Sequence, residues 1–144
     1  AIRLEAPTIV FVPSGLNEIY PSNLNEIYQS CLHYDGVFVS EFLPSQKMNK
    51  GLFARRNRLI SGISIATLIV DARRRSGTML TAQHCATQGR ALMVLPTHPF
   101  DNKGLGGLDL IKDGAAMVRN AADMVEVILS EMPQFNLYSS QHLQ

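Results

Sequence analysis

Short apolar runs alternate along the chain with stretches whose apolar residues are spaced three or four apart. Continuous β-branched runs are typical of strands buried on both faces of a parallel sheet, and apolar residues at helical spacing are typical of helices. The predicted strands cover residues 8–12, 36–40, 66–71, 91–95 and 116–118, and the predicted helices cover 24–31, 55–62, 78–88, 108–113 and 120–131. This alternation predicts an α/β fold, Rossmann-like, with a mostly parallel sheet and helices on both faces.

Polar, proline and glycine residues mark the connections between these elements. Asn23 is followed three residues later by Glu26, which predicts a capping box at the start of the first helix. Residues 44–54 and 97–107 are predicted to be loops. We expect one domain over residues 1–132 and a polar tail or linker over residues 133–144.

The composition favours a packed globular protein. The chain of 144 residues is 46% hydrophobic and 17% charged, which excludes a mostly disordered chain. No run approaches the roughly 18 apolar residues of a membrane-spanning helix. The two cysteines, Cys31 and Cys85, are too few for a disulfide scaffold, so we expect buried, reduced thiols.

The charge is concentrated in the middle of the chain, although the formal net charge is only +1. Residues 47–90 contain nine Lys and Arg, seven of them Arg, against the single acid Asp71, whereas both flanking segments are acidic. Arginine is well suited to bidentate phosphate contacts and to stacking. The central block is therefore interpreted as an anion-binding face, with a solvated surface neutralised by the flanking acids as the alternative.

Two parts of this basic block are candidate binding sites. Residues 73–78 (RRRSGT) follow a predicted strand and enter a helix, so backbone N–H groups, hydroxyls and Arg could hold a phosphate at the carboxyl edge of the sheet. An ordinary helix N-cap with solvated Arg is the alternative. Residues 50–58 (KGLFARRNR) interleave cations with Phe53, as in proteins that hold single-stranded nucleic acid, although Phe53 could equally belong to the core.

The sequence contains no recognisable catalytic or metal-binding motif. The four His residues have no metal-ligand spacing, and His84 and Cys85 are interpreted as packing residues of a helix. Asp71 is expected to pair with the neighbouring Arg cluster. We therefore predict no catalytic residues, no metal and no cofactor.

Seven motifs occur in a fixed order along the chain. They are GLNEIYP at 15–21, SEFLP at 40–44, FARRNRLISGIS at 53–64, IVDA at 69–72, SGTMLTA at 76–82, GR at 89–90 and LIKDGA at 110–115. They are similar to the GLD-x-x-YP, SE-aromatic-P, FPRRNRIIAGLS, VVEA, SGSL-x-TA, GR and LI-x-x-GA motifs of the DprA/Smf family (DNA-processing protein A). The resemblance covers roughly residues 8–130.

The chain departs from the family pattern in three places. Ala54 stands where Pro is usual, residues 95–97 (LPT) stand where V-P-G is usual, and Leu108 stands where Asn or His is common. The family's G-S-R and GG-x-x-x-GID-x-x-H segments have no counterpart here. The resemblance thus implies that the chain corresponds to the C-terminal part of the family's Rossmann-like domain.

The resemblance implies a cytoplasmic bacterial protein that binds single-stranded DNA, helps to load RecA during natural transformation and recombination, is homodimeric and is not an enzyme. The DNA contacts that it implies are Lys50, Phe53, Arg55, Arg56, Asn57, Arg58, Arg75, Ser76 and Gly77. The alternative is a nucleotide-binding protein or a nucleoside-monophosphate hydrolase of the LOG type, whose PGG-x-GT loop resembles residues 75–78. That hydrolase needs an acid after the loop, and residues 79–82 (MLTA) contain none.

Overall fold

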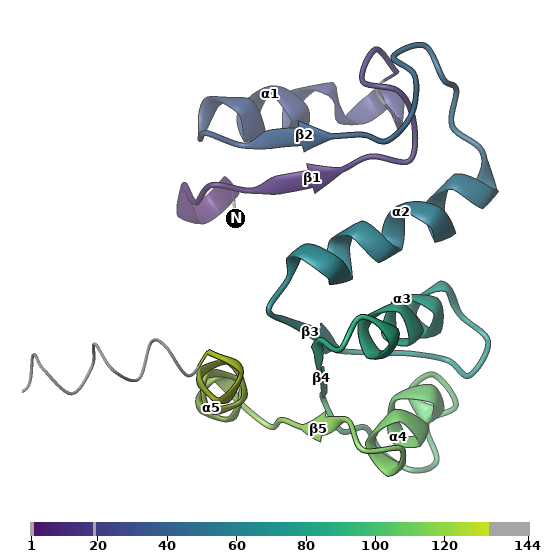
Figure 1. Ribbon diagram of the computed structural model, residues 1–144, viewed down its shortest axis with the longest axis vertical. Coiled ribbons are helices and arrows are strands. Elements are labelled where there is room, and N and C mark those ends of the chain that lie inside the picture. The colour runs from purple at the N-terminus through teal and green to yellow at the C-terminus, as the bar shows by residue number, and fades with distance from the viewer. Residues whose placement is uncertain (1, 19, 133–144) are drawn as a thin grey trace, which may run out of the picture. The chain divides into compact units, whose positions relative to one another are not determined.

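The computed structural model describes residues 2–18 and 20–132, which form two compact units (Figure 1). Unit 1 contains the described residues up to Leu59, and unit 2 contains those from Ile60 onward. Each unit has its own parallel sheet. The predicted division into a domain over 1–132 and a tail stays a prediction, because residues 133–144 lie outside the described residues.

Unit 1 is built around two parallel strands. Strand β1 (Ile9–Phe11) pairs in register with β2 (Val37–Val39), and helix α1 (Asn25–His33) connects them. Short 3-10 helices precede β1 and α1, over Ile2–Leu4 (η1) and Ser22–Leu24 (η2). The stacked rings of Tyr28 on α1 and Phe38 on β2, 4.5 Å apart, help to hold the helix on the sheet.

The turn after β1 is fixed by a close approach of two backbones. A Cβ atom on Gly15 would lie 2.1 Å from the carbonyl oxygen of Leu43, so only glycine fits. The Gly15 N–H donates to the carbonyl of Gln46, and Ser40 donates to the carbonyl of the buried Ser14. The segment that leaves β2 is therefore held against the turn that follows β1.

Two sequence predictions for unit 1 are wrong. Asn23 lies inside η2, and α1 begins without a side-chain cap, so the predicted capping box is not formed. Helix α2 spans Lys50–Ile63, so residues 50–54 are helical and not part of a loop. The reason is Asn49, whose side-chain oxygen accepts a hydrogen bond from the N–H of Gly51 at 3.0 Å and stabilises an earlier helix start.

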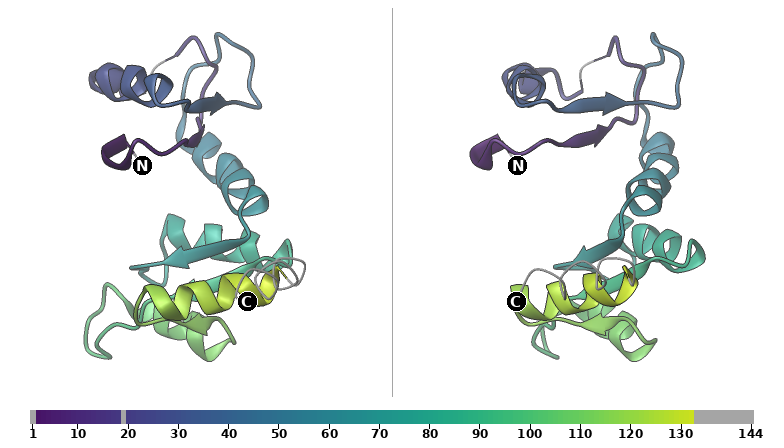
Figure 2. Two further views of the ribbon diagram at one scale, coloured as in Figure 1. Left: turned by 90° about the vertical axis from the view of Figure 1, so that its left-hand side faces the viewer. Right: turned by 60° about the vertical axis from the view of Figure 1, so that its left-hand side comes forward.

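Unit 2 has a three-stranded parallel sheet in the order β3–β4–β5. The strands are β3 (Ala66–Ile69), β4 (Ala91–Val94) and β5 (Ala116–Met117), and the helices are α3 (Gly77–Thr87), α4 (Leu105–Lys112) and α5 (Ala121–Glu131). Figures 1 and 2 show α3 and α4 on one face of this sheet and α5 on the other. The predicted α/β fold with parallel strands and helices on both faces is confirmed.

The core of unit 2 lies between the sheet and the pair α3–α4. Ile69, Ala72, Ala82 and Val94 are buried there, with Met79 and Leu110 packed against them. Cys85 is fully buried, as predicted, and its thiol donates to backbone carbonyls at the start of β4. This packing fixes the strand ends from which the loops of the unit project.

Helix α5 begins with a reciprocal cap that was not expected. The N–H of Asp123 donates to the side-chain oxygen of Asn120 at 3.1 Å, and the Asp123 carboxylate accepts from the N–H and the guanidinium of Arg119. These contacts lower the pKa of Asp123 to about 2, with the hydrogen bond from the Arg119 side chain as the largest cause. The start of α5 is thereby tied to the end of β5.

Candidate nucleic-acid interface

Helix α2 presents its predicted contact residues on two sides. Lys50, Phe53 and Asn57 are spaced by three and four residues and share one side of the helix. Arg55 and Arg58, three residues apart, both face the segment that follows β2: Arg55 lies over the Phe42 ring at 5.7 Å, and Arg58 forms an ion pair with Glu41. The helix thus presents cations in two directions.

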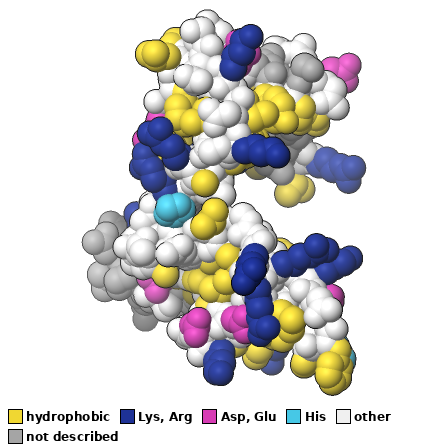
Figure 3. Space-filling model, turned by 90° about the vertical axis from the view of Figure 1, so that its right-hand side faces the viewer, with side chains coloured by type: hydrophobic (Ala, Val, Ile, Leu, Met, Phe, Trp, Pro, Cys, Tyr) yellow, Lys and Arg dark blue, Asp and Glu magenta, His cyan; other side chains and the backbone are white. Residues whose placement is uncertain are grey.

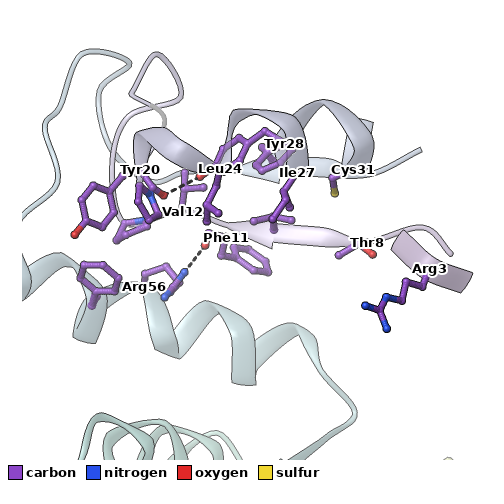
Figure 4. A pocket seen from close by; sticks show the side chains of 15 residues that line it. Arg3, Thr8, Phe11, Val12, Tyr20, Leu24, Ile27, Tyr28, Cys31 and Arg56 are labelled. Atoms are coloured by element: carbon purple, nitrogen blue, oxygen red, sulfur yellow. Dashed lines mark hydrogen bonds between the residues drawn. The ribbon is translucent and has the colours of Figure 1, made fainter. Parts of the chain in front are cut away.

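Phe53 is half-buried beside another ring. Its ring meets that of Tyr20 edge-to-face, with centroids 6.2 Å apart, and the Arg56 guanidinium lies 5.6 Å from its centroid. Both rings line a pocket of about 780 Å³ in unit 1, whose other lining residues come from β1, β2, the three helices η1, η2 and α1, Arg56 of α2 and the connecting segments (Figure 4). Phe53 is therefore neither a fully buried core residue nor a fully exposed one.

Arg56 holds α2 to the end of β1. Its guanidinium donates to the carbonyl oxygen of Phe11 (Figure 4). Through Nε it also donates to the side-chain oxygen of Asn57 at 3.2 Å. Burial lowers the pKa of Arg56, the expected effect of desolvating a cation. Because part of its hydrogen-bonding capacity is used within the protein, Arg56 positions Phe53 and Asn57 as well as supplying charge.

Lys50 and Arg55 differ from their neighbours. Both are exposed, and neither forms an ion pair with any of the residues that the structure describes. An exposed cation with no internal acidic partner can bind an external anion without losing a salt bridge. Arg58 would have to exchange Glu41 for a phosphate. Lys50 and Arg55 are therefore the cations of α2 most available to a ligand.

The second basic segment connects β3 to α3 in unit 2. Arg73, Arg74 and Arg75 are all exposed. Arg74 makes a bidentate ion pair with Asp109 on α4, at 2.7 and 3.1 Å, which raises the pKa of Arg74 and lowers that of Asp109. Asp71 was expected to take this role, but it forms no ion pair with the described residues, because α4 presents Asp109 to the cluster instead.

The start of α3 is open to an anion. Ser76 occupies the N-cap position with an extended backbone, but its side chain makes no cap hydrogen bond, and its buried Oγ has no partner within the described part of the chain. A Cβ atom on Gly77 would meet nothing within 4 Å, so the backbone there can be approached closely. Arg75 lies next to these groups along the chain, so cation, hydroxyl and helix N-terminus occur together.

The structure divides the predicted site residues between the two units. Lys50, Phe53, Arg55, Arg56, Asn57 and Arg58 belong to unit 1, and Arg75, Ser76 and Gly77 to unit 2. Sequence reasoning missed Tyr20 as the neighbour of Phe53, although Tyr20 lies in the GLNEIYP motif, which could have drawn attention to it. It also missed Asp109, for which no local signal exists.

Two further features of the described residues bear on the kind of site. Over residues 2–18 and 20–132, no three His, Cys, Asp or Glu side chains are grouped as metal ligands. None of the helices described is long and apolar enough to cross a membrane.

Comparison with known proteins gives a consistent result. The sequence profile of the family described as DNA recombination-mediator protein A matches residues 1–129. Protein Smf of Escherichia coli K12 is 36% identical over 96% of this chain and 39% of its own length, and DNA processing protein DprA of Bacillus subtilis 168 is 33% identical over 95% and 44%. The chain thus spans less than half the length of these curated relatives.

Two solved structures share the fold. DNA processing protein A from Streptococcus pneumoniae superposes with a TM-score of 0.77 at 26% identity, covering 88% of this chain and 44% of that one. DNA processing protein A from Helicobacter pylori, whose description concerns its single-stranded DNA binding mode, superposes with a TM-score of 0.75 at 28% identity, covering 85% and 56%. The resemblance inferred from the motifs is therefore confirmed, and the chain belongs to the DNA recombination-mediator protein A (DprA/Smf) family.

Proposed function

We propose that this chain binds single-stranded DNA through the basic segment of each unit. The observation that carries the proposal is that one helix, α2, carries two exposed cations without an internal acidic partner, Lys50 and Arg55, together with the aromatic ring of Phe53. The single-stranded DNA binding described for the Helicobacter pylori protein supports the same ligand. Cations that follow the phosphates and rings that stack on bases are how such ligands are held.

Each predicted residue has a definite part in this proposal. In unit 1, Lys50, Arg55 and Arg58 contact phosphates and Phe53 stacks on a base. Arg56 holds Phe53 and Asn57 in place and adds its charge, and Asn57 contacts a base edge or supports the backbone. In unit 2, Arg75, the Ser76 hydroxyl and the backbone N–H of Gly77 bind a phosphate at the start of α3.

The wider role we propose is that of a recombination mediator in the bacterial cytoplasm, which helps to load RecA onto single-stranded DNA during natural transformation and recombination, as a homodimer. Membership of the recombination-mediator family supports this role. We propose that the protein is not an enzyme, because no acid follows the Gly77 loop where a LOG-type hydrolase requires one. Release of ribose phosphate from AMP by the purified chain would overturn that part of the proposal.

The decisive experiment is fluorescence anisotropy with a labelled oligo(dT) 30-mer over a series of salt concentrations. Affinity should fall with salt at a log–log slope of about −0.7 for each phosphate neutralised. Arg55→Ala should weaken binding and make the slope shallower by about 0.7, the loss of one phosphate contact.

Lys112→Ala is the matched control, because Lys112 is equally exposed but lies at the last turn of α4, away from the strand ends where that helix begins. Binding that does not depend on salt, or an equal effect of the two substitutions, would contradict the proposal.

A further inference from the structure

The loop between β4 and α4 displays an aromatic ring to solvent. The side chain of Phe100 is 89% exposed, and the exposed His98 ring lies beside it with centroids 5.5 Å apart. Single exposed hydrophobic residues are common on protein surfaces and need no explanation by themselves. The construction of this loop and its charged surroundings distinguish Phe100 from such residues.

Hydrogen bonds within the loop hold the ring outward. The N–H of Phe100 donates to Nδ1 of His98 at 3.3 Å, and the N–H of Asp101 donates to the His98 carbonyl at 2.9 Å. The Asp101 side chain accepts from the N–H of Lys103 at 2.9 Å. The two ends of the loop meet where Gly104 approaches Thr97, since a Cβ atom on Gly104 would lie 2.0 Å from the Thr97 methyl carbon.

This loop and the Arg-rich loop leave the same edge of the unit 2 sheet. Strands β3 and β4 are parallel neighbours, so their carboxyl ends lie side by side, and the N–H of Leu95 donates to the carbonyl of Ile69 at that edge. The N–H of Gly106 donates to the carbonyl of Ala72 at 2.8 Å, which joins the start of α4 to the segment entering the Arg cluster. The same edge therefore carries Phe100, His98, Lys103, Arg73 and Arg75.

The combination of charges and rings determines the kind of ligand. Lys103, Arg73 and Arg75 are exposed and form no ion pair among the residues described. They outnumber the exposed acids of the same two loops, Asp71 and Asp101, so the edge keeps a net positive charge beside the rings. Figure 3 shows basic side chains gathered next to hydrophobic ones on the face of unit 2 that is in view. A protein partner would require a larger apolar patch than one ring, whereas a nucleotide needs one ring face for its base and one cation for its phosphate.

We propose that Phe100, with His98 beside it, is a stacking platform for a base of single-stranded DNA in unit 2, additional to Phe53 in unit 1. The proposal rests on the single-stranded DNA binding proposed above and adds a contact residue to it. The loop departs from the family's V-P-G pattern at residues 95–97, so the platform would be a property of this chain.

The test uses the absence of tryptophan from the sequence. Phe100→Trp in the 144-residue chain gives a single fluorescent reporter. The oligo(dT) 30-mer should quench its emission to saturation. The oligonucleotide concentration at half-maximal quenching should equal the concentration at half-maximal binding that anisotropy gives for the wild type. Val125→Trp is the control: this residue is half-exposed on α5, on the other face of the sheet, so its reporter should not respond. Circular dichroism establishes that each variant is folded.

Affinity measurements complete the test. Phe100→Ala should weaken binding by roughly five-fold or more, the lower end of the range for losing one stacked base. Phe100→Tyr should restore it, and Phe100→Leu should not, because only a ring can stack.

The outcomes separate the two proposals. If the wild type binds in a salt-dependent manner but Phe100→Trp is not quenched and Phe100→Ala binds normally, the platform is refuted and the proposed function stands. If the wild type does not bind at any salt concentration, both are refuted.

Discussion

Replacing Arg56 by alanine is expected to destabilise unit 1 clearly more than replacing its neighbour Arg55. The two residues have the same charge and adjacent positions on α2. Arg56 is half-buried and donates to the carbonyl of Phe11, whereas Arg55 is exposed and its guanidinium lies over the face of the Phe42 ring. The pair therefore distinguishes a structural contact from a freely available charge.

The expected magnitude follows from the contacts of Arg56. A hydrogen bond from a charged donor contributes about 1.5–3 kcal/mol, and the cation–π contact with Phe53 about 0.5–1 kcal/mol. The conformational entropy lost when a long Arg side chain is ordered offsets up to about 2 kcal/mol of the stabilisation from these two contacts. We expect Arg56→Ala to lower the free energy of unfolding by about 2 kcal/mol. Arg55→Ala, which removes a cation–π contact with Phe42 but no hydrogen bond to the backbone, should lower it by no more than about 1 kcal/mol.

Urea unfolding followed by tyrosine fluorescence measures this difference. Tyr20, Tyr28 and Tyr34 belong to unit 1, so the signal reports largely on that unit. Arg56→Lys should be more stable than Arg56→Ala but less stable than the wild type, because an ammonium group cannot reproduce the planar set of N–H donors of the guanidinium. Equal unfolding midpoints for Arg56→Ala and Arg55→Ala would refute the assignment of Arg56 as the residue that holds α2 to β1.

Two further predictions concern unit 2. The folded-state pKa of Asp123, about 2, lies below the ordinary value of 3.8, so its stabilising effect is complete above about pH 4 and is lost as pH falls towards 2. Asp123→Asn should thus lower the melting temperature at pH 6 and flatten its decline between pH 4 and 2; an unchanged decline would contradict the assignment. Gly106→Ala should destabilise the unit by roughly 1–3 kcal/mol, because its Cβ would lie 2.7 Å from the carbonyl oxygen of Ala72. Gly51→Ala is the control, because its Cβ would lie an ordinary 3.4 Å from the nearest atom. Thermal unfolding should show no comparable loss of stability in that variant. Equal losses of stability in the two variants would refute the steric explanation.

The local pattern of the sequence was sufficient to predict the strands and to locate the basic segments. Continuous apolar runs predicted all five strands, with ends differing from the structure by a residue or two, because burial on both faces of a parallel sheet requires such runs. The ordered motifs identified the family, which the comparisons confirm. The helix starts were predicted less well: Asn23 was taken for a cap that does not form, and Asn49, which does cap a helix, was assigned to a loop.

The tertiary structure alone determined the partners of Arg56, Arg58 and Arg74. Arg56 reaches a carbonyl 45 residues away, Arg74 pairs with an acid 35 residues away, and Arg58 pairs with one 17 residues away. Such partners cannot be predicted from periodicity, because periodicity reports which face of an element is buried and not which element packs against that face. The sequence by itself therefore established that the chain carries a basic, arginine-rich surface on a parallel α/β fold. Which of those arginines remain free for a ligand was decided by long-range packing.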